Sequence, residues 1–241
     1  MSRNEDEESV YRAALVGLQR WLGKARDAVM RPWFQYKMQP DPTAIFATQD
    51  AWNREVETIL TVLGRISMHA WSLATDVPPV SRHAFVMSQL AQTQNFLVRM
   101  PDEIYNLIFA ELTDGTNAGE SLEQLARRID NLLSWTGSEN WPGRARNIAV
   151  TETTRAYGAG TLAAGMEQSR VTGKRLAKQW LTEADVSVRP SHRAVDHDIQ
   201  PLSGMFMVGG FPLLFPGDPA GPADEVCGCR CDLVIVDEGG Q

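Results

Sequence analysis

Residues 144–173 read RARNIAVTETTRAYGAGTLAAGMEQSRVTG. Steps of four and three residues place the following side chains on one stripe: Ile148, Glu152, Arg155, Ala159, Leu162 and Met166. This period predicts a long helix whose stripe faces the protein interior. Glu152 and Arg155 are three residues apart, so they can pair on one helix face. Burying such a pair alone is costly, and we therefore expect further polar groups around it.

The same segment carries a second face made of small residues. Ala156, Gly160 and Ala164 are spaced by four, which lets another element approach the helix closely. Gly173 marks the predicted end of the helix, because glycine accepts the left-handed conformation that often follows a last helical turn.

The chain before residue 144 has helical periodicity throughout. A first amphipathic helix is predicted over about residues 7–30, ending at Pro32, and a second starts near Thr43. The second helix carries a regular seam of Trp52, Val56, Ile59, Leu63, Ile66 and Leu73. A seam of this kind packs on another helix, either the first helix of this chain or a helix of a partner protein.

Val77-Pro78-Pro79 interrupts the helical pattern and predicts a boundary. We therefore expect a helical hairpin over residues 1–76 and a second domain over residues 80–238. Ser121 and Gln124 form a capping-box pattern that predicts a helix start inside the second domain.

The pattern changes to a strand period after Gly173. Leu176, Lys178 and Trp180 alternate with their neighbours, and residues 206–208 and 233–236 are further strand candidates. The predicted fold class is α+β, with a mostly helical N-terminal part followed by a small irregular α+β domain with short antiparallel strands.

Composition indicates a globular protein. The 241 residues are 43% hydrophobic and 22% charged, and no apolar run approaches the ~20 residues needed to cross a bilayer. The net charge is −7, yet nine Lys/Arg against four Asp/Glu lie between residues 144 and 193. Such a basic segment is either an ordinary solvated face or a DNA contact. The candidates for a DNA contact are Arg170, Lys174, Arg175 and Lys178.

The three cysteines, Cys227, Cys229 and Cys231, lie within five residues of one another. An odd number of clustered cysteines argues against a disulfide framework. His192 and Asp196 lie upstream, so the ligand types of a zinc site are present. The candidate metal ligands are His192, Cys229, Cys231 and Asp196. The alternative is a set of buried thiols with hydrogen-bonded histidines.

A further hypothesis is that the acidic and histidine residues over positions 192–198 form the active site of a metal-dependent enzyme. The sequence contains no Gly-rich phosphate loop, no G-x-S-x-G and no H-E-x-x-H motif. No catalytic residue is therefore assigned. The structural alternative is a polar network that orders a small domain, made of Glu152, Arg155, Arg189, Asp218 and Arg230. Asp218 in this set occupies a Pro-Gly-Asp-Pro turn.

Five short motifs follow in order along the C-terminal third of the chain. They are Thr151-Glu152-Thr153, Lys178-Gln179-Trp180, Arg189-Pro190-Ser191-His192 with Asp196, Pro216-Gly217-Asp218-Pro219 and Cys229-Arg230-Cys231. Together they resemble the phage Mu F-like minor head protein family over roughly residues 80–238. The chain departs from the family pattern at Val150, His197 and Gly228, where arginine, glycine and asparagine are usual.

The resemblance implies a structural minor component of a tailed-phage head rather than an enzyme. Its expected place is the virion, inside the head near the portal, after synthesis in the host cytoplasm. Expected partners are the portal protein, the major capsid or scaffold protein and packaged DNA, with no membrane. The expected role is in head assembly, DNA packaging or ejection, with residues 1–76 as the portal-binding region. The alternative is a metal-dependent enzyme that acts on nucleic acid or the cell wall during infection.

Overall fold

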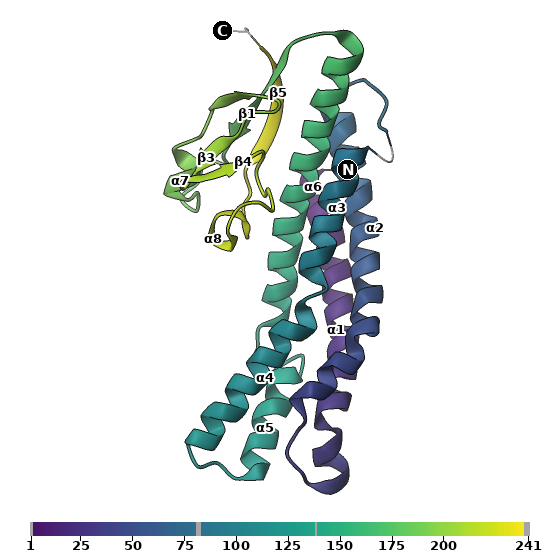
Figure 1. The fold of residues 1–241 in the computed structure, drawn as a ribbon, viewed down its shortest axis with the longest axis vertical. Helices are drawn as coiled ribbons and strands as arrows, with labels where there is room; N and C mark the ends of the chain where they lie inside the picture. Colours follow the sequence, from purple (N-terminus) through teal and green to yellow (C-terminus); the bar gives the residue numbers. More distant parts are fainter. Residues whose placement is uncertain (1, 81–82, 138, 239–241) are drawn as a thin grey trace. The chain divides into compact units, whose positions relative to one another are not determined.

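The computed structural model describes residues 2–80, 83–137 and 139–238 (Figure 1). Helices come first and strands follow. The elements are α1 (Arg3–Tyr36), the 3-10 helix η1 (Pro42–Thr48), α2 (Gln49–Ala74), α3 (Ala84–Leu97), α4 (Met100–Asn117), α5 (Leu122–Leu133), α6 (Trp141–Thr172), β1 (Leu176–Leu181), α7 (Pro190–Arg193), β2 (Ile199–Pro201), β3 (Phe206–Val208), β4 (Phe211–Leu213), α8 (Ala223–Val226) and β5 (Asp232–Asp237). This order confirms the predicted α+β class.

Two compact units emerge from the internal contacts. Unit 1 comprises residues 1–11, 60–93 and 147–241, and unit 2 comprises residues 12–59 and 94–146. This grouping differs from a division of the chain at residues 77–80, since each unit takes segments from both sides of that point. The reason lies in the length of α1, α2 and α6, whose residues contribute to both units.

Unit 2 is a helical assembly with a tryptophan pair in its core. The rings of Trp21 on α1 and Trp52 on α2 lie 5.3 Å apart. Trp21 Nε1 donates to Thr48 Oγ1 at 2.8 Å, and Trp52 Nε1 donates to the carbonyl of Leu97. Each indole therefore buries its ring and still satisfies its N–H, as buried tryptophan requires.

The seam predicted on the second helix lies inside the protein. Trp52, Val56, Ile59, Leu63 and Ile66 are all buried, whereas Leu73 is 67% exposed. The structure therefore corrects the assignment of this seam to a partner protein. The side chains are already used in the chain's own core, in agreement with the intramolecular alternative.

Unit 1 carries two small antiparallel sheets. One has the strand order β2-β1-β5, and the other pairs β3 with β4. Trp180 lies opposite Leu233 across β1 and β5, and Lys178 lies opposite Ile235. The three strands predicted from the sequence, at residues 176–181, 206–208 and 233–236, are all present, which confirms them.

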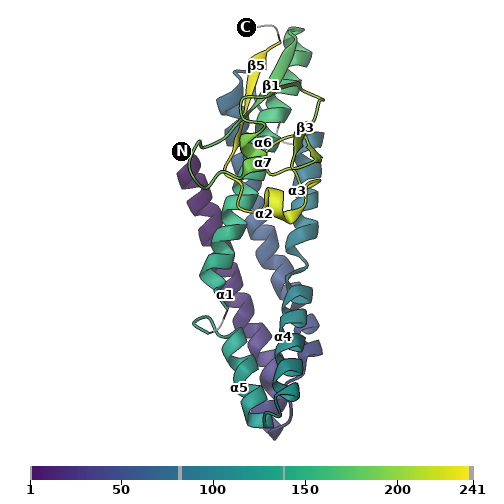
Figure 2. The same ribbon diagram turned by 90° about the vertical axis from the view of Figure 1, so that its left-hand side faces the viewer.

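The three-stranded sheet β2-β1-β5 packs against α6 (Figures 1 and 2). A Cβ added at Gly165 would lie 2.6 Å from Ile235 Cδ1, so β5 approaches the helix there as closely as glycine allows. On another side of α6, a Cβ at Gly160 would lie 2.2 Å from the carbonyl oxygen of Ser67 on α2. The predicted small-residue face therefore does admit a close neighbour.

The predicted capping box at the start of α5 is confirmed. Ser121 Oγ accepts from the Gln124 backbone N–H at 3.3 Å, and Gln124 Oε1 accepts from the Ser121 N–H at 2.7 Å. Of the helices in the described part of the chain, none is long and apolar enough to cross a membrane.

Candidate functional site

Two threonines of α6, Thr151 in the Thr-Glu-Thr motif and Thr154 just after it, hold the backbone of the cysteine segment. Thr154 Oγ1 donates to the carbonyl of Cys229 at 2.6 Å, and the Gly228 N–H donates to Thr151 Oγ1 at 2.9 Å. Gly228 has a φ of +67°, a left-handed conformation that glycine adopts at no steric cost. The turn before Cys229 is therefore fixed on the helix by side chains three residues apart.

Glu152 and Arg155 form a buried ion pair within the same helix. Arg155 Nη1 contacts both carboxylate oxygens of Glu152, at 2.9 and 2.7 Å. Thr93 Oγ1 on α3 donates to Glu152 Oε2 at 2.9 Å, and Arg155 Nε donates to the carbonyl of Gly217 at 3.0 Å. The further polar groups that the sequence required around this pair are therefore Thr93 and the Gly217 backbone.

Burial raises the pKa of Glu152 above its ordinary value of 4.5. The charge of Arg155 and the hydrogen bonds from Thr93 and Arg155 oppose this rise and partly offset it. The pair depends on these partners, because an ion pair taken out of water is favourable only when its remaining hydrogen-bonding groups are satisfied.

Asp218 shapes the loop that receives Arg155. Its Oδ2 accepts from the Leu214 N–H at 2.7 Å, and its Oδ1 accepts from the Ala220 N–H at 2.9 Å. The neighbouring Gly217 has a φ of +82° and lies against the backbone of Arg155. Asp218 is thus a turn residue, which places the Gly217 carbonyl where Arg155 can reach it.

Arg189 and Arg230 do not join this network, which corrects their expected place in a single polar network with Glu152, Arg155 and Asp218. Arg230 Nη2 pairs with Asp185 Oδ2 at 2.6 Å, and Arg189 Nη2 donates to the carbonyl of Cys227. Both lie on loops at the protein surface, so they find partners there. The five predicted network residues therefore divide into a buried group at α6 and two separate surface contacts.

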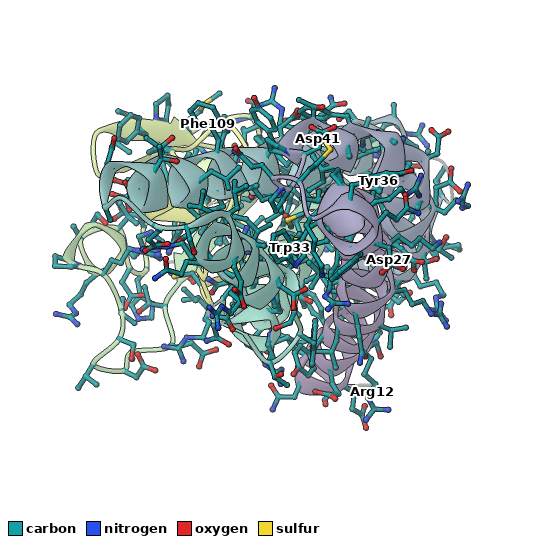
Figure 3. The ribbon with its side chains drawn as sticks, turned by 90° about the horizontal axis from the view of Figure 1, so that it is seen from below. Arg12, Asp27, Trp33, Tyr36, Asp41 and Phe109 are labelled. Atoms are coloured by element: carbon teal, nitrogen blue, oxygen red, sulfur yellow. The ribbon has the colours of Figure 1, made fainter. Side chains whose placement is uncertain are left out.

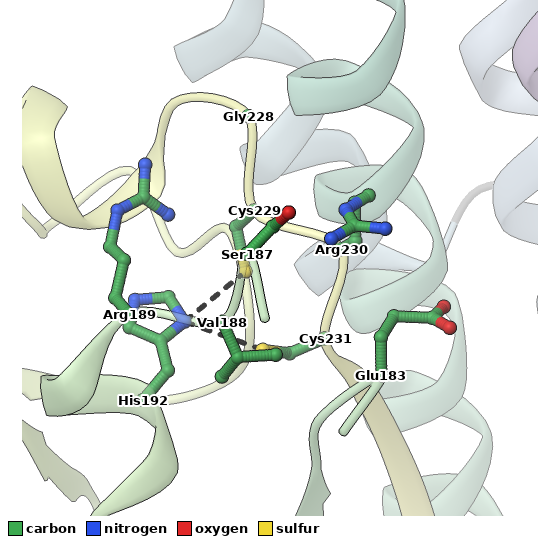
Figure 4. Close-up of a pocket in the computed structure, with 9 residues that line it drawn as sticks. All are labelled: Glu183, Ser187, Val188, Arg189, His192, Gly228, Cys229, Arg230 and Cys231. Atoms are coloured by element: carbon green, nitrogen blue, oxygen red, sulfur yellow. Dashed lines mark hydrogen bonds between the residues drawn. The ribbon is translucent and has the colours of Figure 1, made fainter. Parts of the chain in front are cut away.

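His192, Cys229 and Cys231 come together in the interior (Figure 4). His192 Nδ1 lies 3.3 Å from Cys231 Sγ and 3.7 Å from Cys229 Sγ. All three side chains are buried, and one ligand atom from each lies within 4.8 Å of the others. The histidine is presented by the short helix α7, which begins with Pro190 after Arg189 at its N-cap.

The hydrogen bond between the thiols of Cys229 and Cys231 shifts their two pKa values in opposite directions. The hydrogen bond from Cys231 holds the pKa of Cys229 well below its usual value, and His192 adds to this effect against the opposing effect of burial. The same hydrogen bond, together with burial, raises the pKa of Cys231. Burial lowers the pKa of His192, but the hydrogen bond and charge of Cys229 outweigh it, so the net pKa of His192 is raised.

Glu225 completes the surroundings of His192, although no pattern in the sequence indicated this residue. Glu225 Oε2 lies 3.1 Å from His192 Nε2 and accepts from Ser191 Oγ at 2.8 Å. The two residues are 33 positions apart, and Glu225 lies on the short helix α8. No spacing rule links such positions, because the loops between them are irregular.

Asp196 and Cys227 lie elsewhere. Asp196 Oδ1 accepts from the Thr182 N–H at 2.8 Å, so this carboxylate supports the end of β1 rather than the cysteine group. Cys227 is exposed, whereas the other two cysteines are buried. The structure therefore leaves His192, Cys229 and Cys231 as the cluster among the four predicted ligands.

The residues predicted to contact DNA differ in their exposure to solvent. Arg170, Lys174 and Arg175 are exposed, but Lys178 is fully buried and its Nζ donates to the carbonyl of Leu202 at 2.9 Å. Burial lowers the pKa of Lys178 to about 8, with the charge of Asp218 acting in the opposite direction. Lys178 shares a strand face with Trp180, which points into the core, so DNA contact at Lys178 is excluded by its position.

Two polar contacts near the N-terminus were also missing from the sequence analysis. Arg3 pairs with Asp232 at the start of β5 and donates to Thr154 Oγ1 at 2.8 Å. Asp6 Oδ2 is 2.6 Å from His69 Nδ1 and accepts from the Tyr157 hydroxyl at 2.7 Å. The first turns of α1 belong to unit 1, and these contacts join them to segments of the same unit that lie more than 60 residues away in sequence.

The comparisons with known proteins place the chain in a family. Residues 106–234, more than half of the chain, match the family described as Phage Mu protein F like protein. The chain therefore belongs to the phage Mu F-like family, as its motifs predicted. It is 28% identical over 148 residues to the minor head protein GP7 of Bacillus phage SPP1. That alignment covers 59% of this chain and 44% of GP7.

A second relative is named as an enzyme. The chain is 25% identical over 171 residues to the NAD(+)--arginine ADP-ribosyltransferase EFV of Enterococcus faecalis (strain ATCC 700802 / V583). The alignment covers 67% of this chain but 33% of EFV. The chain thus spans less than half the length of either relative. No solved structure matches the chain.

Proposed function

We propose that this protein is a structural minor head protein of a tailed phage, associated with the portal vertex inside the capsid, where it aids head assembly, DNA packaging or ejection. Family membership over residues 106–234 and the likeness to a named minor head protein support this proposal. Polar residues in and beside the Thr-Glu-Thr motif also support it, because Thr151 accepts from the Gly228 N–H, and Thr154 and Arg155 donate to the Cys229 and Gly217 carbonyls. Groups committed to backbone contacts in this way serve packing rather than chemistry.

The proposed contact surface with the portal lies in unit 2. The seam on α2 is already buried, so another apolar surface is needed. What we call the aromatic surface consists of Phe46 on η1 and of Tyr105 and Phe109 on α4. The ring centroid of Tyr105 lies 5.1 Å from that of Phe46 and 6.2 Å from that of Phe109. Phe46 is 43% exposed and Phe109 is 56% exposed. Figure 3 labels Phe109 on the outer side of α4. Exposed aromatic clusters are enriched at protein interfaces, where a few such residues supply most of the binding energy.

The double variant Phe46→Ser/Phe109→Ser tests this surface. Both side chains lie at the surface, so the fold should persist, while affinity for the portal protein of the same phage should fall by about tenfold or more. The measurement is co-purification of the full chain with the co-expressed portal protein, followed by titration of the purified pair. Val186→Ser is the matched control, because Val186 is almost fully exposed in unit 1 and its loss should leave binding unchanged.

The two parts of the proposal fail separately. If the wild-type chain shows no binding to the portal protein, portal association itself is contradicted. If the wild type binds and the double variant binds equally well, portal association stands and the aromatic surface is contradicted.

A further inference from the structure

We propose that His192, Cys229 and Cys231 bind one zinc ion, which joins α7 to the segment that leads into β5. Two thiolates and one imidazole are ligand types that zinc prefers. The proposal concerns an ion held by two segments of unit 1 and is independent of what the protein binds in the phage head.

The two nitrogen–sulfur distances fit a tetrahedral ion. With Zn–S bonds of about 2.3 Å and Zn–N bonds of about 2.05 Å, a tetrahedral site separates nitrogen from sulfur by roughly 3.6 Å. The observed distances from His192 Nδ1 are 3.3 Å to Cys231 Sγ and 3.7 Å to Cys229 Sγ. An ion can therefore occupy the space between them with shifts of a few tenths of an ångström.

The far side of the imidazole is arranged as metal-bound histidines usually are. Histidine ligands commonly donate their second N–H to a carboxylate, which fixes the ring orientation and the tautomer. His192 Nε2 faces Glu225 Oε2 at 3.1 Å, and Ser191 Oγ holds the same oxygen. With the proton on Nε2, the lone pair of Nδ1 points toward the two sulfur atoms.

Hydrogen bonds also position the two cysteines. Thr151 and Thr154 fix the backbone at Gly228 and Cys229, so the Cys-x-Cys turn is positioned before any ion binds. The buried indole N–H of Trp180 has no oxygen or nitrogen acceptor in the described part of the chain, and Cys231 Sγ lies beside it.

The fourth coordination position faces a small cavity. This cavity has a volume of about 20 Å³ and is lined by all three ligands together with Glu183, Ser187 and Arg189 (Figure 4). It has room for one water molecule. A site with three protein ligands and one water completes the tetrahedron.

Metal content of the purified protein tests the proposal. The full chain is purified without a metal-affinity tag, dialysed under reducing conditions and analysed by elemental mass spectrometry. We expect about one zinc per chain in the wild type and in Cys227→Ser, and almost none in Cys229→Ser/Cys231→Ser. Cys227 is the matched control because it has the same chemistry and lies two residues away, outside the cluster. Absence of zinc from the wild type, or equal zinc in the double variant, would overturn the proposal.

A second measurement covers the case in which the double variant does not fold. The wild type is stripped of metal with a chelator and titrated with Co²⁺, which reports thiolate coordination through charge-transfer absorption in the near ultraviolet and tetrahedral geometry through intense visible bands. We expect both signals in the wild type, and affinity reduced by about 10–100-fold in Glu225→Gln, which replaces the carboxylate that faces His192 Nε2 and Ser191 Oγ by a neutral amide. Absence of the charge-transfer band from the wild type, or unchanged affinity in Glu225→Gln, would contradict the arrangement proposed.

Discussion

Replacing Arg155 by methionine should lower the free energy of unfolding by about 3–5 kcal/mol, because it leaves the Glu152 carboxylate buried without its partner. Thr93 would remain as a donor to Glu152, but the carbonyl of Gly217 would lose its bond from Arg155 Nε. The change should appear as a lower urea midpoint and a Tm lower by roughly 10 °C. Calorimetry and urea unfolding of the full-length variant measure both.

The loss of stability in Arg155→Met should depend on pH. The folded state already raises the pKa of Glu152 above 4.5, so it binds the proton more tightly than the unfolded state. Stability from this group is therefore fully present below pH 4.5 and is lost as the pH rises through the raised value. Removing Arg155 removes a charge that lowers this pKa, so the variant should recover stability on acidification more than the wild type does.

Two controls separate the buried pair from charge loss in general. Arg170→Met breaks an exposed pair with Glu167 on the same helix, and its stability should match that of the wild type. Glu152→Gln/Arg155→Met removes both charges and should recover at least half of the loss. A wild-type Tm in Arg155→Met at neutral pH would show that the pair does not support the fold.

Gly160→Ala should destabilise the protein by about 1–3 kcal/mol, although alanine is the better helix former. The new Cβ would lie 2.2 Å from the carbonyl oxygen of Ser67, which belongs to the backbone of α2 and cannot rotate away. The two helices would have to separate, and the core between them would lose contacts.

Gly23→Ala is the matched substitution for this test. Gly23 also lies inside a helix, α1, but a Cβ there meets nothing within 4 Å. The variant should therefore be more stable than the wild type by about 0.5–1 kcal/mol, through helix propensity alone. If urea unfolding showed the same change for both variants, the close approach of α6 to α2 would be contradicted.

The sequence predicted the features that depend on local spacing. The stripe on α6, the capping box at Ser121 and the three strand segments follow from periods of 3.6 or 2 and from capping chemistry, which operate over a few residues. The pairing of Glu152 with Arg155 belongs to the same class, because the two lie three residues apart on one helix.

Other features depend on which segments meet in three dimensions. Thr93, Glu225 and the Arg3–Asp232 pair reach their partners across 33 to 229 residues, and no local pattern marks them. Lys178 was misread for a physical reason: its charge suggested the surface, but the strand period placed it with Trp180 in the core. Pro32 was expected to end the first helix, yet α1 continues through it to Tyr36, although a proline removes one backbone N–H from the helix.

The motifs of the C-terminal third now have a common physical role. The threonines of α6 hold the cysteine turn, Arg155 of the same helix reaches the Pro-Gly-Asp-Pro loop, and His192 meets both buried cysteines. Five short segments that are individually weak signals thus specify one packed centre in unit 1. Such a centre orders short strands and irregular loops that a hydrophobic core of this size would hold less uniquely.

Counting copies of the chain in purified heads tests its association with the portal. Heads are assembled from the proteins of the phage that encodes the chain, with and without the portal protein, and the chain is quantified by mass spectrometry against the major capsid protein. We expect the chain to be present in heads that contain the portal and absent from heads that lack it. Absence of the chain from both kinds of head, or equal amounts in both, would contradict a portal-associated minor head protein.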